Sequence, residues 1–145
     1  MAEIWPDEGL DLAMEIFPRG GTNLTTTYLC LFTAFTASTV GSSSQGADSY
    51  TEPDFGSYAR QSIAAASWGA LAAGTGGRRT TAAQVTFPTA TTPNSSVSTK
   101  GWWLANQLSA TGDKCIAAAN FDDTTASQIN IGDQIKVTPT LQSNN

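Results

Sequence analysis

The sequence predicts an all-β fold: an antiparallel β-sandwich of about seven strands, preceded by a short N-terminal amphipathic helix. Two observations predict the sandwich. The chain has 21 Thr among 145 residues, and short strand-like apolar runs alternate with turn residues. The helix precedes the strands and does not alternate with them, which disfavours a parallel α/β sheet. We expect an N-terminal helical arm over residues 1–21 and a single β-sandwich domain over residues 22–145.

The first segment has the pattern of an amphipathic helix. Pro6 suits the first helical position, where its missing N–H costs nothing. Leu10, Met14 and Phe17 follow at intervals of four and three residues, which places them on one face. Pro18 and the glycines behind it end the helix. Five acidic residues and no basic residue among the first 15 positions make the outer face strongly negative.

The strand-like segments are Thr25–Phe35, Ser57–Trp68, Ala83–Phe87, Gly101–Leu108, Lys114–Phe121, Ser127–Ile131 and Gln134–Leu141. The first is apolar on both faces, as expected of a central strand covered on two sides. In the fourth, Trp102 and Trp103 are adjacent and must point to opposite faces. Gly132-Asp133 resembles a hairpin turn between the last two. Ser38–Ser49 and Thr89–Lys100 have the composition of loops.

Composition and charge disfavour several classes of function. The net charge is −5 and the seven basic residues are scattered, which argues against binding to nucleic acid. With no His and two Cys, neither a zinc site nor a Ser-His-Asp or Cys-His catalytic arrangement can form. We therefore expect no catalytic residues, no metal, no cofactor and no enzymatic activity.

The chain start and the apolar runs indicate a soluble protein. Acidic residues occupy the region where a signal peptide would need basic ones. The longest mostly apolar uncharged run, Ile63–Ala73, is far shorter than the ~20 residues of a membrane span. The cysteines Cys30 and Cys115 lie in strand-like segments, where they could form one long-range disulfide or remain two buried free thiols.

Two other segments have a functional and a structural interpretation. Gly74–Arg79 superficially suggests phosphate binding, but it lacks the P-loop spacing and favours a flexible hairpin tip carrying Arg78 and Arg79. Asp122-Asp123 could offer oxygen ligands to calcium, but without the spacing of a dedicated loop it favours a polar turn.

Four motifs follow one another along the chain: Tyr28-Leu29-Cys30-Leu31-Phe32-Thr33, Thr51-Glu52-Pro53 with Gly56 and Tyr58-Ala59-Arg60, Thr86-Phe87-Pro88-Thr89-Ala90-Thr91, and Gly132-Asp133. In this order they resemble a widespread family of small tailed-phage virion proteins, described as tail-fibre-like or head-decoration proteins. Within the second motif, Arg60 could pair with Glu52 or remain a solvated side chain on a strand edge. The chain departs from the family in two places. The family usually has Trp-Gly soon after the third motif, whereas here Thr92–Lys100 intervenes before Gly101. The acidic N-terminal helix is the second departure. The resemblance implies a compact, non-enzymatic β-domain built into a virion.

On this basis we expect a capsid decoration (cement) protein that binds the outer shell, located in the virion after assembly in the host cytoplasm. Its partners would be the major capsid protein and copies of itself, as a trimer or another symmetric cluster. The alternatives are a neck, collar or tail-fibre component, or a module that binds host glycans through an exposed Trp. Neither nucleic acid nor a membrane is expected as a partner. The residues expected at the partner interface are Trp5, Leu10, Met14, Phe17, Arg78 and Arg79.

Overall fold

A computed structural model of the protein describes residues 24–35, 47–74, 77–94, 98–121 and 128–142. These residues form strands and two short 3-10 helices, and every strand pairing is antiparallel. The strands are β1 (Thr26–Phe32), β2 (Ala34–Phe35), β3 (Tyr50–Thr51), β4 (Gln61–Ala64), β5 (Ala72–Gly74), β6 (Gly77–Thr81), β7 (Val85–Thr86), β8 (Gly101–Ala105), β9 (Cys115–Asn120), β10 (Lys136–Val137) and β11 (Thr140–Gln142). The 3-10 helices are η1 (Ala47–Ser49) and η2 (Ala65–Ser67). The predicted N-terminal helix lies outside the described residues.

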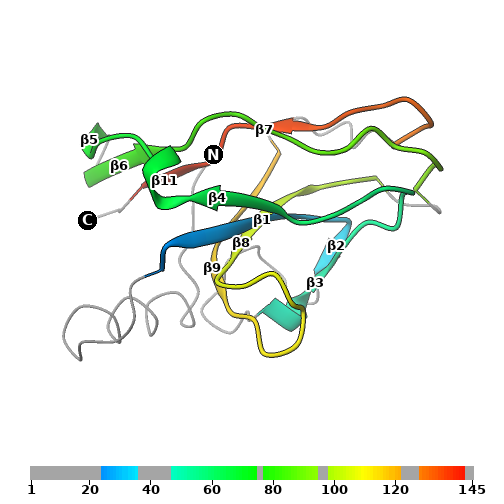
Figure 1. Ribbon diagram of the computed structural model, residues 1–145, viewed down its shortest axis with the longest axis horizontal. Coiled ribbons are helices and arrows are strands. Elements are labelled where there is room, and N and C mark those ends of the chain that lie inside the picture. The colour runs from blue at the N-terminus through cyan, green and yellow to red at the C-terminus, as the bar shows by residue number, and fades with distance from the viewer. Residues whose placement is uncertain (1–23, 36–46, 75–76, 95–97, 122–127, 143–145) are drawn as a thin grey trace.

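The largest sheet has the strand order β4-β1-β8-β9, with β1 and β8 in its middle (Figure 1). Leu29 of β1 pairs with Leu104 of β8, and Trp103 of β8 pairs with Ala118 of β9. The other strands form three smaller sheets, ordered β11-β6-β5, β10-β7 and β2-β3. Figure 1 shows β5, β6 and β11 together at one end of the molecule.

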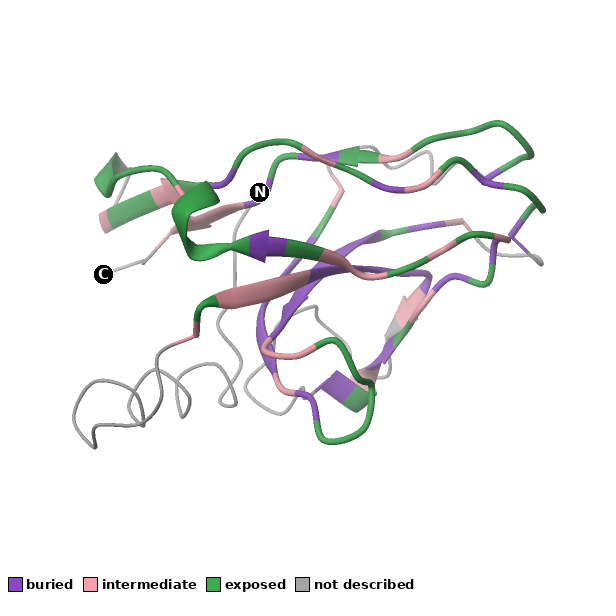
Figure 2. Cartoon of the chain, in the orientation of Figure 1, coloured by how far each residue is buried: buried purple, intermediate pink, exposed green. Residues whose placement is uncertain are grey.

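Both faces of the largest sheet are buried. Alternate side chains of β1 and β8 point to one face, where Leu31 and Trp102 join Phe87 in what we call the large core. On the opposite face, Cys30 and Trp103 join other residues in the small core. The buried stretches of β1, β8 and β9 stand out in Figure 2, whereas the β5–β6 end is mostly exposed. The predictions of a doubly covered first strand and of opposite faces for the adjacent tryptophans are confirmed.

The sandwich prediction holds in part, because the described residues are mostly β and antiparallel but form one sheet of four strands and three small ones. Ser57–Trp68 was predicted as one strand, yet only β4 pairs there and η2 follows it. The last predicted strand is split into β10 and β11, with Pro139, which has no N–H to donate, between them. The described residues of Ser127–Ile131 form no strand.

The expected loops are partly confirmed. A turn does form at Gly132, whose φ of 91° suits glycine, and Asp133 N donates to Asn130 O at 3.1 Å. Residues 89–94 and 98–100 contain no strand, as predicted for that loop. The expected tip is the β5–β6 hairpin, which is closed by the pairing of Gly74 with Gly77.

Cys30 and Cys115 are both buried thiols and are not joined in a disulfide, so of the two alternatives the structure favours two buried thiols. Cys30 pairs with Trp103 and Cys115 with Ala105, so strand β8 lies between the two cysteine-bearing strands. In the part of the chain that the structure describes, no helix is long and apolar enough to cross a membrane.

Candidate functional site: a junction of four motifs and an apolar pocket

The four sequence motifs meet around Tyr58. The hydroxyl of Tyr58 accepts a hydrogen bond from Leu31 N at 3.1 Å, and it donates one to Glu52 Oε2 at 2.6 Å. Its ring stacks on Phe87 with 6.1 Å between centroids and 9° between planes, and it meets Phe55 edge-on at 5.4 Å. Tyr58 therefore joins β1, its own motif and the Phe87 motif, and we call this assembly the motif junction.

Gly56 brings the turn before Tyr58 against the segment after Phe87. Its N–H donates to Thr92 Oγ1 at 2.7 Å, and its carbonyl accepts from Thr91 N at 3.0 Å. A Cβ at this position would lie 2.4 Å from Thr91 Oγ1 and 2.9 Å from Thr92 N, distances that require the neighbours to move. Glycine is thus needed here for a close approach of two chain segments.

The closing Gly132-Asp133 motif contacts the same segment through the main chain. Ala90 N donates to Asp133 O at 2.9 Å, and Gly132 N donates back to Ala90 O at 2.9 Å. Phe87 N donates to Ile135 O at 2.9 Å. These main-chain hydrogen bonds hold the third motif against the large core, in which Phe87 is fully buried.

Arg60 supplies the positive charge in the motif junction. Its Nε and Nη2 lie 2.9 Å and 2.5 Å from Glu52 Oε1, and its Nη1 lies 2.7 Å from Asp113 Oδ2. The guanidinium lies 5.0 Å from the ring centroid of Trp103, within the range of a cation–π contact. The Arg60 side chain is only 8% exposed. Of the two alternatives that the sequence left open for Arg60, the pairing with Glu52 is the one that forms, whereas the contacts with Asp113 and Trp103 were not foreseen.

The junction changes the pKa of the groups within it. Burial, followed by the nearby Glu52 carboxylate, raises the pKa of Tyr58 far above its usual value. Burial also raises the pKa of the Cys30 thiol, against the opposing effect of the Arg60 charge. Burial alone would lower the pKa of Arg60, but hydrogen bonds to Glu52 and Asp113 outweigh it and raise that pKa. Tyr58 and Cys30 thus stay neutral and Arg60 stays charged across ordinary pH.

This arrangement is suited to holding the fold and not to catalysis. Both oxygens of the Glu52 carboxylate are used, one by Tyr58 and one by Arg60. A general acid or base needs a pKa near the working pH, whereas the pKa of Tyr58 is moved away from it. Among the described residues, no group of three His, Cys, Asp or Glu side chains could hold a metal ion.

The predicted interface residues are placed only in part. Arg78 and Arg79 lie on β6 and are exposed, and Arg78 Nη2 donates to Leu71 O at 3.1 Å. Trp5, Leu10, Met14 and Phe17 lie outside the described residues, as does Asp122-Asp123. Trp102 and Trp103, considered for glycan binding, are 3% and 1% exposed, so neither can serve as a sugar platform.

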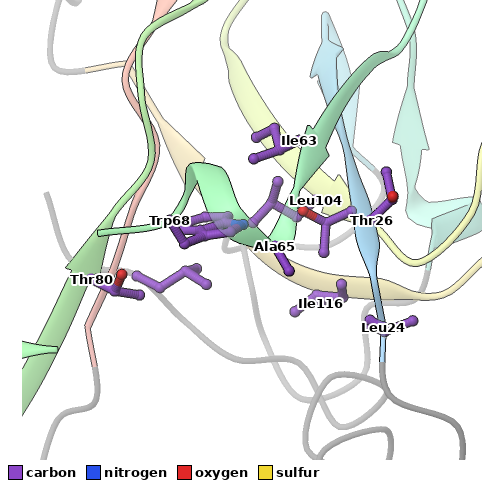
Figure 3. Close-up of a pocket in the computed structure, with 10 residues that line it drawn as sticks. Leu24, Thr26, Ile63, Ala65, Trp68, Thr80, Leu104 and Ile116 are labelled. Atoms are coloured by element: carbon purple, nitrogen blue, oxygen red, sulfur yellow. The ribbon is translucent and has the colours of Figure 1, made fainter. Parts of the chain in front are cut away.

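Sequence reasoning missed an apolar pocket of about 230 Å³ between the largest sheet and the β6–β11 end of the molecule. Figure 3 shows Trp68 and Ala65 on one side of it, and Ile116 and Leu24 on the other. Its full lining is Leu24, Thr26, Thr27, Ile63, Ala65, Trp68, Thr80, Leu104, Ile116 and Leu141. These residues come from six separate parts of the chain, and no local pattern in the sequence brings them together.

Residues 18–141 match the family described as podophage GP4 fiber I protein gp80. The match covers most of the chain, including all four motifs of the junction. The chain belongs to this fibre family. It is therefore a structural fibre protein of the phage virion, as the resemblance of its motifs indicated. The comparison with curated proteins gave no match.

Membership of the fibre family decides between two expectations. Capsid decoration was the main expectation, and a tail-fibre component was an alternative; the family supports the alternative. The match begins at residue 18, so the acidic segment with Trp5, Leu10, Met14 and Phe17 lies outside the shared part of the fibre family.

Proposed function

We propose that the chain is a non-catalytic structural subunit of a podophage tail fibre. The family match carries this proposal, together with the contacts that the residues of the shared motifs make inside the domain. Every charged or hydroxyl group of the motif junction that could take part in chemistry contacts another protein group. The shared residues therefore build a stable β-domain and leave its outer surfaces for assembly.

We further propose that the subunit assembles with copies of itself into a trimer or another symmetric cluster. Fibres are built from repeated chains, and closed symmetry gives each copy the same contacts. The chain is rich in Thr, Ala and Ser, and only 13% of its residues are charged, which limits the repulsion between copies. Light scattering after gel filtration would give the number of copies, and a monomer at all concentrations would argue against self-assembly.

Purified virions provide the decisive test of the fibre role. Gold-labelled antibody against the chain should bind at the tail, and quantitative mass spectrometry should give a copy number far below that of the shell protein. Label spread over the head, with a copy number close to that of the shell protein, would instead support a capsid decoration protein that contacts the major capsid protein.

A further inference from the structure

We propose that the apolar pocket is the docking site of the chain's own N-terminal arm, here residues 5–17, which would seat Phe17 in it and pack Leu10 and Met14 against its rim. The proposal concerns how one subunit is completed and does not depend on its position in the virion. It assigns an occupant to a pocket that the family motifs leave unfilled, since none of those motif residues lines it.

The size and chemistry of the pocket fit a few apolar side chains. Its volume of about 230 Å³ is lined by Leu, Ile, Ala and Trp side chains together with three threonines. An apolar cavity of about 150 Å³ can hold a benzene molecule, so this pocket has room for a phenyl ring and part of a second side chain. It is smaller than the roughly 300 Å³ at which pockets for drug-sized ligands begin. Protein side chains are therefore better suited to it than a free organic ligand.

Several lining residues remain incompletely covered. Leu24, Trp68 and Leu141 pack against the large core but are only partly buried. Thr27 Oγ1 is inaccessible to water, and among the residues that the structure describes it has no hydrogen-bond partner. A segment that lies over this region would bury the remaining apolar surface, which is favourable in proportion to the area removed from water.

The length of chain before Leu24 selects the occupant. Leu24 lines the pocket itself, and Phe17 is seven residues earlier, a span of at most about 25 Å when extended. Pro18, Gly20 and Gly21 in between are residues that let a chain reverse its direction. A segment tethered this closely has an effective local concentration in the millimolar range, which favours it over the same segment of another copy.

The charges near the pocket match those of the arm. Arg78 and Arg79 directly precede Thr80, which lines the pocket, and both arginines are exposed. In the helix that the sequence predicts for the arm, acidic residues such as Asp11 lie outside the apolar stripe. Attraction between these groups would orient the arm over β6, while the apolar contacts hold it.

Paramagnetic NMR on the full-length chain tests the proposal. A nitroxide label on the E15C variant should broaden and remove the amide signals of Trp68, Thr80 and Leu141, which line the pocket and are distant in sequence from the label, and reduction of the label should restore them. The native thiols do not interfere, because Cys30 and Cys115 are fully buried. Signals that persist at all three positions would overturn the proposal.

Two further variants and a mixed sample make the test specific. Adding L10D, M14D and F17D to the labelled chain should abolish the signal loss, whereas the matched control D7N with E8Q should retain it. A65F places a ring in the pocket from an exposed lining position and should also displace the arm.

A mixed sample separates docking within one chain from docking between copies. When chains that carry the nitroxide but no ¹⁵N are mixed with ¹⁵N chains that carry no nitroxide, the amide signals should remain. Loss of the signals in that mixture would assign the pocket to the arm of a neighbouring copy and overturn docking within one chain. The location of the chain in virions would be unaffected by either result.

Discussion

At the scale of single residues, the hydroxyl of Tyr58 links strand β1 to the ion pair of Glu52 and Arg60. It satisfies the main-chain N–H of Leu31 in the middle of β1, and it also donates to the carboxylate that holds Arg60. Buried polar groups are costly when they lose their partners, so each member of this chain of contacts depends on the others.

The variant Y58F should lower the free energy of unfolding by about 1–3 kcal/mol, because it leaves the buried Leu31 N–H without its acceptor. The ring contacts with Phe87 and Phe55 should be retained. Y28F is the matched control, since Tyr28 is a half-buried tyrosine of β1 beside the small core. Urea denaturation would measure both, and equal effects of the two variants would contradict the role of the Tyr58 hydroxyl.

The stability should also fall at alkaline pH. Burial and the Glu52 carboxylate raise the pKa of Tyr58 in the folded protein, so the folded state keeps its proton where the unfolded state releases it. Stability from this group is full below the unfolded pKa of about 10 and declines above it, by up to about 1.4 kcal/mol per pH unit. Urea denaturation at pH values from about 9 to 11, which span that pKa, should show a shallower decline in the free energy of unfolding for Y58F than for the unchanged protein. Parallel declines would contradict this assignment.

Replacing the charge at the centre of the motif junction should have a larger effect. R60M leaves Glu52 and Asp113 without their buried counter-ion, and breaking such a pair typically costs about 3–5 kcal/mol. R79M removes an exposed arginine and should change the free energy of unfolding by less than about 1 kcal/mol. If urea denaturation gave similar values for both, the Arg60 contacts would contribute little to stability.

At the scale of elements, β8 connects the two cores because it lies between β1 and β9 and is buried along its whole length. Its first residue, Gly101, lies where the strand passes closest to its neighbours. A Cβ there would be 2.2 Å from Ala119 O and 2.5 Å from the Phe32 ring. The absence of a side chain at Gly101 thus allows β8 to pair with both neighbours.

The variant G101A should therefore destabilise the protein by at least about 1–3 kcal/mol, since the added methyl group has to displace a backbone carbonyl. G69A is the control, because a Cβ at the exposed Gly69 has one close neighbour, Thr81 O at 3.2 Å. Thermal unfolding would compare the two variants. A G101A protein as stable as G69A would mean that β8 can shift within the sheet at little cost.

The elements that the sequence predicted well are those defined by local alternation. β1 and β8 have apolar residues on both faces, and both are buried on both faces in the structure. The predicted strand Thr25–Phe35 includes β2, whereas its partner β3 was missed, because a two-residue strand has no periodicity to detect. The predicted strand 57–68 was overextended because Tyr58 and Arg60 resemble strand residues, whereas their side chains are used in the motif junction.

At the scale of the whole molecule, the motif junction explains why these motifs identify the family without identifying a chemical activity. They are distant in sequence and meet at Tyr58 and Phe87, so they are required for closing the domain. Sequence proximity suggested the pairing of Glu52 with Arg60 as one of two alternatives. Asp113 lies 53 residues after Arg60, and only the antiparallel arrangement of the strands brings it to the same guanidinium. The apolar pocket depends on tertiary structure in the same way.

The two cysteines offer a readout of the stability of the whole domain. Both are fully buried in the small core, and burial raises the pKa of Cys30, so neither thiol should react with a disulfide reagent in the native protein. If labelling requires global unfolding, its rate follows the population of the unfolded state. R60M, which we expect to lose about 3–5 kcal/mol, should then accelerate labelling by about 100- to 4,000-fold, while R79M should leave it nearly unchanged. Fast labelling of the unchanged protein, at a rate that R60M does not alter, would show instead that the small core opens locally while the motif junction remains closed.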